Sequence, residues 1–149
     1  MIKDWDTKFL DLAEHISEWS KDPSTKVGAV IVDQNRRIIS TGYNGFPVGI
    51  MDSFDRYSNR NIKYEMIIHA EANAILFAKQ DLHGMAIYTT PLQPCSRCAS
   101  LIIQSGIKKV VSYSSSEENP RWKDNFALAK ELFEEAEVEL ILLQKVYNV

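Results

Sequence analysis

The sequence predicts an α/β fold in which helices cover both faces of one five-stranded mixed sheet, a three-layer α/β/α arrangement. Four segments place apolar residues at helical spacing, and five short apolar runs lie between them. In the second half of the chain strands and helices alternate, which is typical of strands joined by helical crossovers. The length of 149 residues predicts a single domain, residues 1–149.

The beginning of the chain is expected to form a helix followed by a β-hairpin. The helix covers residues 6–20 and ends before Pro23, because proline disfavours the helical conformation in the residue before it. Two apolar runs, 27–32 and 37–41, predict the hairpin, with the turn at residues 33–35. The apolar side chains that set the helical spacing are Phe9, Leu12, Ala13, Ile16 and Trp19.

Two loops are expected before the second helix. Residues 42–49 contain three glycines together with Asn44 and Pro47, and this composition predicts a backbone that turns sharply. Residues 50–64 are polar and irregular, so they are expected to form no regular structure. A structureless stretch of this length in a compact domain is typical of a lid or a binding loop.

The rest of the chain is expected to bring four side chains together. Right-handed crossovers place the amino ends of the second and third helices at the same edge of the sheet. His69 and Glu71 lie at or near one of these ends. Cys95 and Cys98 lie at the other, so the four should meet. The predicted elements are a helix over 65–80, a strand over 85–90, a helix from Pro94 to Gly106, a strand over 109–113, a polar loop over 114–120, a helix over 122–136 and a strand over 138–143.

The charge balance argues against a nucleic-acid-binding protein. Lys plus Arg number 17 and Asp plus Glu number 20, a net charge of −3, whereas domains that hold nucleic acid usually carry a strong basic excess. A local basic pocket for one or two phosphates is compatible with this balance. No apolar run approaches the roughly 18 residues of a membrane span, and residues 1–6 lack the apolar stretch of a signal peptide. We therefore expect a soluble cytoplasmic protein with no membrane contact.

The two cysteines point to a metal site. One pair cannot build a disulfide framework, and in an intracellular protein a close pair favours metal binding or redox chemistry. With His69, the thiolates of Cys95 and Cys98 give zinc three ligands and leave the fourth tetrahedral position for water, which is the arrangement of a catalytic zinc. Glu71 lies two residues after His69 and is better placed beside that water than on the metal. From there it can accept a proton and pass it on.

Each of these residues also has an ordinary structural interpretation. A lone C-x-x-C at the start of a helix fits a redox pair. A lone histidine is usually a satisfied core residue, and we keep an ordinary structural interpretation for His15 and His83, which are expected on a helix face and in a loop. Glu71 alone would be a solvated helix residue. The combination of His69 with the cysteine pair makes zinc the preferred interpretation.

The order of these motifs resembles a known enzyme family. His69-Ala70-Glu71 followed by Pro94-Cys95-Ser96-Arg97-Cys98 matches the H-x-E…P-C-x-x-C signature of zinc-dependent nucleobase deaminases. Longer blocks resemble the deoxycytidylate (dCMP) deaminases of the cytidine deaminase-like superfamily, over roughly residues 9–140. These blocks are residues 21–32, 41–47, 69–75 and 103–107.

The resemblance implies an activity and its zinc site. It implies a five-stranded sheet between helices, one catalytic Zn²⁺ per subunit, and hydrolysis of dCMP to dUMP and ammonia. His69, Cys95 and Cys98 correspond to the zinc ligands and Glu71 to the proton shuttle. A homo-oligomer, commonly a hexamer, is also implied, with activation by dCTP and inhibition by dTTP at a separate site together with Mg²⁺. Some relatives hold a second, structural zinc, but this chain lacks the extra cysteines.

Substrate contacts are implied in the same way. Asn44 resembles the asparagine that hydrogen-bonds the sugar, and the backbone at Ala70 is similar to the segment that reads the pyrimidine edge. Lys26 matches a position near the substrate phosphate. Ser24 and Thr25 are added to it as neighbouring donors, on their hydroxyl chemistry alone.

One family feature is missing after the fourth strand. Some relatives carry an aromatic residue there, whereas this chain has three serines at residues 114–116. We expect Arg121 and Trp122 to supply the phosphate contact and the stacking surface instead.

Other functions remain open from the sequence. Within the enzymes, the substrate could be dCTP, deoxycytidine or adenosine in tRNA, although the acidic balance weighs against tRNA. A non-catalytic nucleotide sensor would bind nucleotide without releasing ammonia. A redox module would form a reversible Cys95–Cys98 disulfide and hold no zinc.

Overall fold

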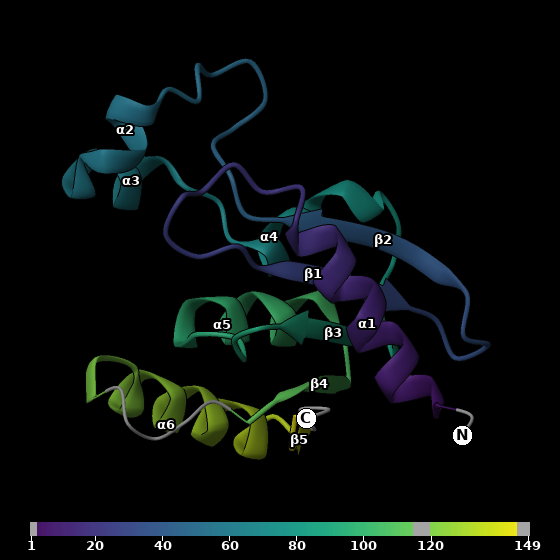
Figure 1. Ribbon diagram of the computed structural model, residues 1–149. Coiled ribbons are helices and arrows are strands. Elements are labelled where there is room, and N and C mark those ends of the chain that lie inside the picture. The colour runs from purple at the N-terminus through teal and green to yellow at the C-terminus, as the bar shows by residue number, and fades with distance from the viewer. Residues whose placement is uncertain (1–2, 115–119, 146–149) are drawn as a thin grey trace.

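The computed structural model describes residues 3–114 and 120–145 of the chain (Figure 1). Its elements follow the predicted order, with two additional short helices. In chain order they are α1 (Trp5–Ser17), β1 (Gly28–Val32), β2 (Ile38–Tyr43), α2 (Phe54–Ser58), α3 (Arg60–Met66), α4 (Ala70–Ala78), β3 (Ala86–Thr90), α5 (Ser96–Ser105), β4 (Lys109–Tyr113), α6 (Pro120–Glu135) and β5 (Glu139–Leu143).

The five strands form one sheet in the order β2-β1-β3-β4-β5. β1 pairs antiparallel with β2 and with β3, whereas β3, β4 and β5 run parallel to one another. The predicted hairpin and the predicted helical crossovers are therefore both present. The prediction of an α/β fold with a five-stranded mixed sheet is confirmed.

Helices cover both faces because successive strand residues point to opposite sides of a sheet. Val30 and Val32 of β1 pack with α1 on one face. Ala29 and Ile31 belong to the core on the other face, which α4, α5 and α6 cover. All five residues of β1 are buried, as expected for a strand enclosed on both faces. The result is the predicted three-layer arrangement (Figure 1).

Helices α2 and α3 overturn the expectation that residues 50–64 form no regular structure. Ser53 caps α2 by accepting a hydrogen bond from the Arg56 backbone N–H, and Asn59 caps α3 by accepting one from Ile62. Serine and asparagine are favoured there because they satisfy amides without a partner inside the helix, so the sequence did contain a signal. Within the described residues α2 and α3 pack on each other and on no other helix or strand, and they project from the sheet (Figure 1).

The chain enters α4 later than predicted. Residues 65–66 belong to α3, and the backbone is extended from Ile67 to His69 before α4 begins. Two backbone hydrogen bonds join Gly45 to Ile68. They hold the extended segment beside the loop that follows β2, so Asn44 lies next to the start of α4.

Gly42 lies in β2 rather than in the expected loop, and the position demands close packing. A Cβ on Gly42 would lie 2.5 Å from the backbone nitrogen of Ala74 and also against the carbonyl oxygen of Ala70. The same approach is fixed by Ser40, whose hydroxyl donates to the Ala74 carbonyl oxygen at 2.7 Å. Glycine therefore allows α4 to lie directly on β2.

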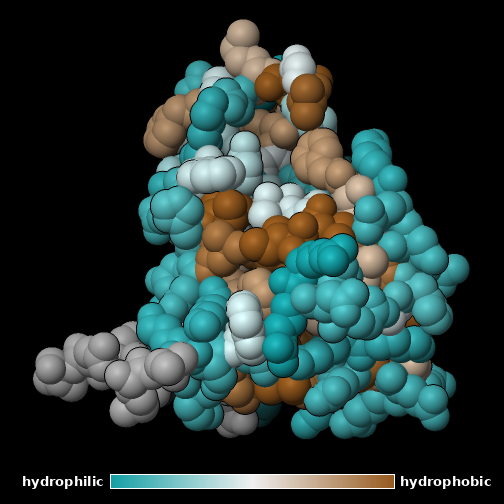
Figure 2. Space-filling model, turned by 90° about the vertical axis from the view of Figure 1, so that its right-hand side faces the viewer, coloured by the Kyte–Doolittle hydropathy of each residue, from teal (hydrophilic) through white to brown (hydrophobic). Residues whose placement is uncertain are grey.

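The surface combines hydrophilic residues with scattered apolar ones. Figure 2 shows the side of the molecule that is on the right in Figure 1, where hydrophilic side chains surround a band of hydrophobic ones. Large apolar side chains are also exposed at Leu76 and Phe77 of α4 and at Leu101 of α5. None of the described helices has both the length and the apolarity to cross a membrane.

Candidate active site

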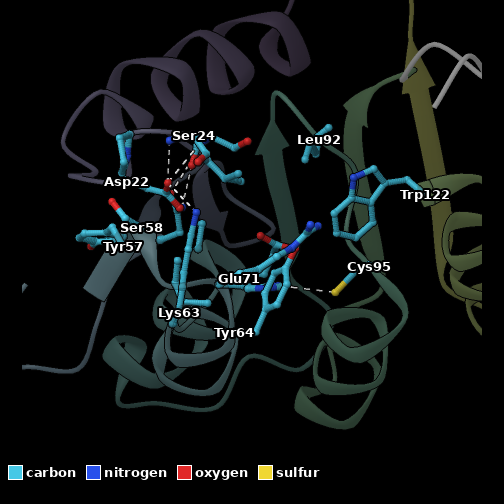
Figure 3. Close-up of a pocket in the computed structure, with 18 of the residues that line it drawn as sticks. Asp22, Ser24, Tyr57, Ser58, Lys63, Tyr64, Glu71, Leu92, Cys95 and Trp122 are labelled. Carbon is cyan, nitrogen blue, oxygen red and sulfur yellow. Dashed lines mark hydrogen bonds and ion pairs between the residues drawn. The ribbon is translucent and has the colours of Figure 1, made fainter. Parts of the chain in front are cut away.

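A cavity of about 740 Å³ lies at the edge of the sheet where α4 and α5 begin. It is bounded by the loop before β1, by α2 and α3, by the segment between β3 and α5, and by α6. Figure 3 shows Lys63 reaching towards Asp22 on one side of the cavity. Trp122 lies on the other side with Cys95 below it, and Glu71 lies between the two sides. Cavities of this size hold small organic ligands and cofactors.

The structure brings the predicted metal ligands together. His69 Nδ1 lies 3.5 Å from Cys95 Sγ and 3.4 Å from Cys98 Sγ, and the three atoms lie within 4.8 Å of one another. Tetrahedral zinc, with Zn–N near 2.05 Å and Zn–S near 2.3 Å, separates nitrogen from sulfur by about 3.6 Å. The observed separations agree with this value, so the three side chains fit zinc.

Both helices that carry ligands begin at a ligand. His69 is the N-cap residue of α4 and Cys95 that of α5, yet neither side chain makes the capping hydrogen bond that is usual there. The first amide of α5 is capped from α6 instead, because the Ser96 N–H donates to Asn125 Oδ1 at 2.9 Å. Asn125 therefore fixes the turn that holds the cysteines, and no pattern in the sequence identifies it.

Burial and mutual contact set the protonation of the site. Burial raises the pKa of Glu71, which is 4% exposed, because desolvation disfavours the charged carboxylate. A hydrogen bond from the Cys98 thiol lowers the pKa of Cys95, and the same contact raises the pKa of Cys98. The contact with Cys95 also raises the pKa of His69. Of the two thiols, Cys95 therefore loses its proton more readily than Cys98.

Asn44 lines the cavity but is already hydrogen-bonded through both ends of its amide. Its Oδ1 accepts from the Val27 N–H at 2.8 Å. Its Nδ2 donates to the Thr25 carbonyl oxygen at 2.9 Å and to Asp22 Oδ2 at 3.2 Å. The side chain predicted to contact the sugar is thus held by three neighbours before any ligand arrives.

The other predicted substrate contacts divide into three groups. Ser24, Thr25, Ala70 and Trp122 line the cavity, and the Trp122 ring stacks on Phe126 with a centroid separation of 5.7 Å. Lys26 is exposed and does not line the cavity. The side chain of Arg121 lies outside the described residues.

Sequence reasoning missed the residues that α3 contributes, because residues 50–64 were expected to be irregular. Lys63 lines the cavity and forms an ion pair with Asp22 at 2.9 Å, with side chains only 14% and 3% exposed. Arg60 also lines it and donates to the Tyr64 hydroxyl through two nitrogens, at 3.1 and 3.0 Å. Arg60, Lys63 and Tyr64 are spaced i, i+3 and i+4, so they lie on one face of a helix. This spacing was the signal in the sequence that could have predicted α3.

A family model described as "Cytidine and deoxycytidylate deaminase zinc-binding region" matches residues 3–114. The chain belongs to this deaminase family. A deaminase of Aliivibrio fischeri is 47% identical over 144 residues, with 96% of each chain covered. The deoxycytidylate deaminase of Mus musculus is 38% identical over 136 residues, which cover 85% of this chain and 76% of the relative. The zinc-binding region of the family agrees with the fit of the triad to zinc.

Solved structures of deaminases have the same architecture as this family member. The dCMP deaminase of cyanophage S-TIM5, in complex with dCMP and dUMP, aligns with a TM-score of 0.75 at 26% identity, covering 96% of this chain and 99% of that one. A diaminohydroxyphosphoribosylaminopyrimidine deaminase/reductase from Thermotoga maritima aligns with a TM-score of 0.65 at 28% identity, covering 93% of this chain and 36% of that one. The predicted cytidine deaminase-like fold is thus confirmed.

Proposed function

We propose that this chain is a zinc-dependent deaminase that hydrolyses dCMP to dUMP and ammonia. The observation that carries the proposal is the buried Glu71 carboxyl beside the triad of His69, Cys95 and Cys98 in a nucleotide-sized cavity. Relatives that span most of this chain include the deoxycytidylate deaminase of Mus musculus and a probable deoxycytidylate deaminase of Caenorhabditis elegans, which supports a cytosine deoxynucleotide as the substrate.

Glu71 carries the protons of the reaction. Zinc held by the triad supplies Lewis acidity and lowers the pKa of the attacking water. Glu71 accepts one proton from the attacking water and delivers it to N3 of cytosine. It then accepts the second proton from the oxygen added at C4 and passes it to the amine, which leaves as ammonia while that oxygen becomes the C4 carbonyl of dUMP. The raised pKa of Glu71 suits this role, because a proton shuttle works best when its pKa is near the operating pH.

The walls of the cavity bind the rest of the nucleotide. The Ala70 N–H is in the first turn of α4, where amides have no partner inside the helix, so it is available to the pyrimidine edge. Trp122 offers a ring for stacking on the base. We add Arg60 and Lys63 to Lys26 as proposed phosphate contacts, because they are the lysine and arginine residues that line the cavity within the described chain. The positive charge of Arg60 favours a phosphorylated substrate over the free nucleoside, whereas that of Lys63 is already paired with Asp22.

Ammonia release from the zinc-loaded protein tests the proposal. Four candidate substrates are compared side by side: dCMP, deoxycytidine, dCTP and CMP. We expect dCMP to have the highest kcat/KM. The Glu71→Gln variant should retain one zinc per chain and lose at least about 100-fold in kcat, the scale of a general acid–base group. Turnover near the wild-type rate in this variant would overturn the role of Glu71.

The remaining expectations extend the proposal. We propose a homo-oligomer, with a hexamer favoured, because the exposed apolar residues Leu76, Phe77 and Leu101 are of the kind that subunit interfaces cover. Activation by dCTP, inhibition by dTTP, the use of Mg²⁺, a cytoplasmic location and a single domain over 1–149 stay predictions. Adding dCTP or dTTP, with and without Mg²⁺, to the dCMP assay tests the regulation, and light scattering tests the assembly.

A further inference from the structure

The hydrogen bonds of Asn44 decide what this side chain can offer to a ligand. A carboxamide has two N–H donors and two acceptor sites on its oxygen. Both donors are in use, on Asp22 and on the Thr25 carbonyl oxygen, and one acceptor site is in use on the Val27 N–H. The polar capacity that remains is a second acceptor site on Oδ1. Towards the cavity, Asn44 is therefore an acceptor and not a donor.

Asp22 is the group that holds this arrangement. It is 2% exposed, and Oδ2 accepts from Asn44 Nδ2. Oδ1 accepts from the Ser24 backbone N–H at 2.8 Å and from Lys63 Nζ at 2.9 Å. One buried carboxylate thus joins the loop before β1, the loop after β2 and helix α3. Because α3 packs only on α2 among the described helices and strands, the ion pair with Lys63 is a principal attachment of that wall.

We propose that Asp22 is a positioning residue that fixes the Asn44 amide with its oxygen towards the nucleotide, so that the site selects a sugar with a donating 3′-hydroxyl. The inference rests on the proposed function. dCMP has two uncharged hydrogen-bond donors, the N4 amino group and the 3′-hydroxyl. The N4 amino group is on the reacting carbon. The 3′-hydroxyl is therefore the donor left for Asn44.

The reversed orientation of the amide is disfavoured by every neighbour. If Oδ1 and Nδ2 exchanged places, the new N–H groups would face the Val27 N–H. The oxygen would face the Thr25 carbonyl and the Asp22 carboxylate. Replacing Asp22 by asparagine removes the restraint on the orientation of the Asn44 amide. An amide nitrogen in place of Asp22 Oδ2 would put a hydrogen-bond donor against the Asn44 Nδ2 donor. The buried donors would then outnumber the acceptors available to them.

A series of ligands tests the polarity of Asn44 on the unaltered pocket wall. Binding to the zinc-loaded Glu71→Gln protein, which should not turn over, is measured by calorimetry for dCMP and three analogues. 2′,3′-Dideoxy-CMP has no 3′ polar group, the 3′-fluoro analogue lacks a donor, and the 3′-amino analogue donates. We expect the dideoxy and fluoro analogues to bind roughly ten-fold more weakly than dCMP, as for one lost hydrogen bond, and the amino analogue to bind within about three-fold of dCMP. Fluoro binding as tight as dCMP would overturn the inference.

Variants then separate positioning from general damage. In otherwise wild-type holoenzyme, Asp22→Asn should raise the KM for dCMP roughly ten-fold with a much smaller change in kcat, and should abolish most of the discrimination against the dideoxy analogue. Lys63→Gln should raise KM but keep that discrimination, because the contact between Asp22 and Asn44 survives. Asp52→Asn is the matched control, since Asp52 also pairs with a lysine, Lys21, but on the surface at 42% exposure. It should behave as wild type.

The outcomes distinguish this inference from the proposed function. If dCMP binds with the expected ranking but is not deaminated by the wild-type protein, the function fails and the inference holds. If dCMP is deaminated but the analogues bind equally, or Asp22→Asn keeps full discrimination, the inference fails and the function holds. If no nucleotide binds, both fail. If Asp22→Asn does not fold, the ranking of the ligand series decides.

Discussion

Replacing Gly42 by alanine is expected to damage the active site from the far side of helix α4. The added Cβ would lie 2.5 Å from the Ala74 backbone nitrogen and against the Ala70 carbonyl oxygen, whereas ordinary contact begins at 3.4 Å. Backbone atoms cannot rotate out of the way, so β2 or α4 must move by roughly 1 Å to remove the overlap. Because α4 begins at His69, this movement reaches the zinc ligand and Glu71.

The size of the effect follows from that displacement. Overpacking of this kind lowers the free energy of unfolding by about 1–3 kcal/mol. In a chain of this length, that change lowers Tm by roughly 3–10 °C. The effect on turnover should be larger, because a misplacement of about 1 Å at a reacting group costs on the order of 100-fold in rate.

Circular dichroism of the zinc-loaded protein measures Tm, and ammonia release from dCMP measures kcat. Gly45→Ala is the control, since an added Cβ at Gly45 meets only the Tyr57 hydroxyl, at 3.9 Å. It should keep both values close to wild type. A Gly42→Ala protein that melts and turns over like wild type would show that this close approach does not place α4.

Two further predictions concern zinc binding and the other end of the sheet. Because the raised pKa of Cys98 keeps its thiol protonated beside the Cys95 thiolate, zinc binding near pH 7 should release about one proton or more. Zinc affinity should therefore rise with pH. Calorimetry of zinc binding in buffers of different ionisation enthalpy measures the number of protons released, and a value of zero would refute the prediction. Tyr88→Phe removes a 2.7 Å hydrogen bond to Asp6 and should lower the free energy of unfolding by about 1 kcal/mol, measured by urea denaturation. The turnover rate of the Tyr88→Phe variant should equal that of the wild type, so a loss of dCMP deamination in this variant would contradict the prediction.

Local patterns predicted much of the fold. The strand predicted over 109–113 has the same bounds in the structure, and α1 and β1 begin within one residue of their predicted starts. The helix has apolar residues at helical spacing and the two strands are short apolar runs, and local sequence expresses both patterns directly. The predicted helix over 65–80 was wrong at its start, because the pairing of Gly45 with Ile68 keeps the chain extended up to His69. That pairing joins residues 23 positions apart, and no local pattern contains it.

The chemistry of the site was also readable in part. Zinc requires particular ligand atoms, so the residue types and the spacing of His69, Cys95 and Cys98 were enough to predict a zinc site. Contacts with the sugar and phosphate have weaker requirements, because many polar residues can make them. Lys26 was placed near the phosphate from its position in a motif. In the structure it is exposed and does not line the cavity, whereas Lys63 lines it from a segment expected to be irregular.

By itself, the sequence determined the fold class, and it predicted the metal triad and the proposed proton shuttle, because each depends on residue type and short spacing. Only the tertiary structure decided which groups line the cavity. It placed Asp22 between Asn44 and Lys63, capped the cysteine turn with Asn125 and buried Glu71 so that its pKa rises. Burial and hydrogen-bond geometry arise when distant segments meet, and they determine whether a polar side chain donates, accepts or holds a proton.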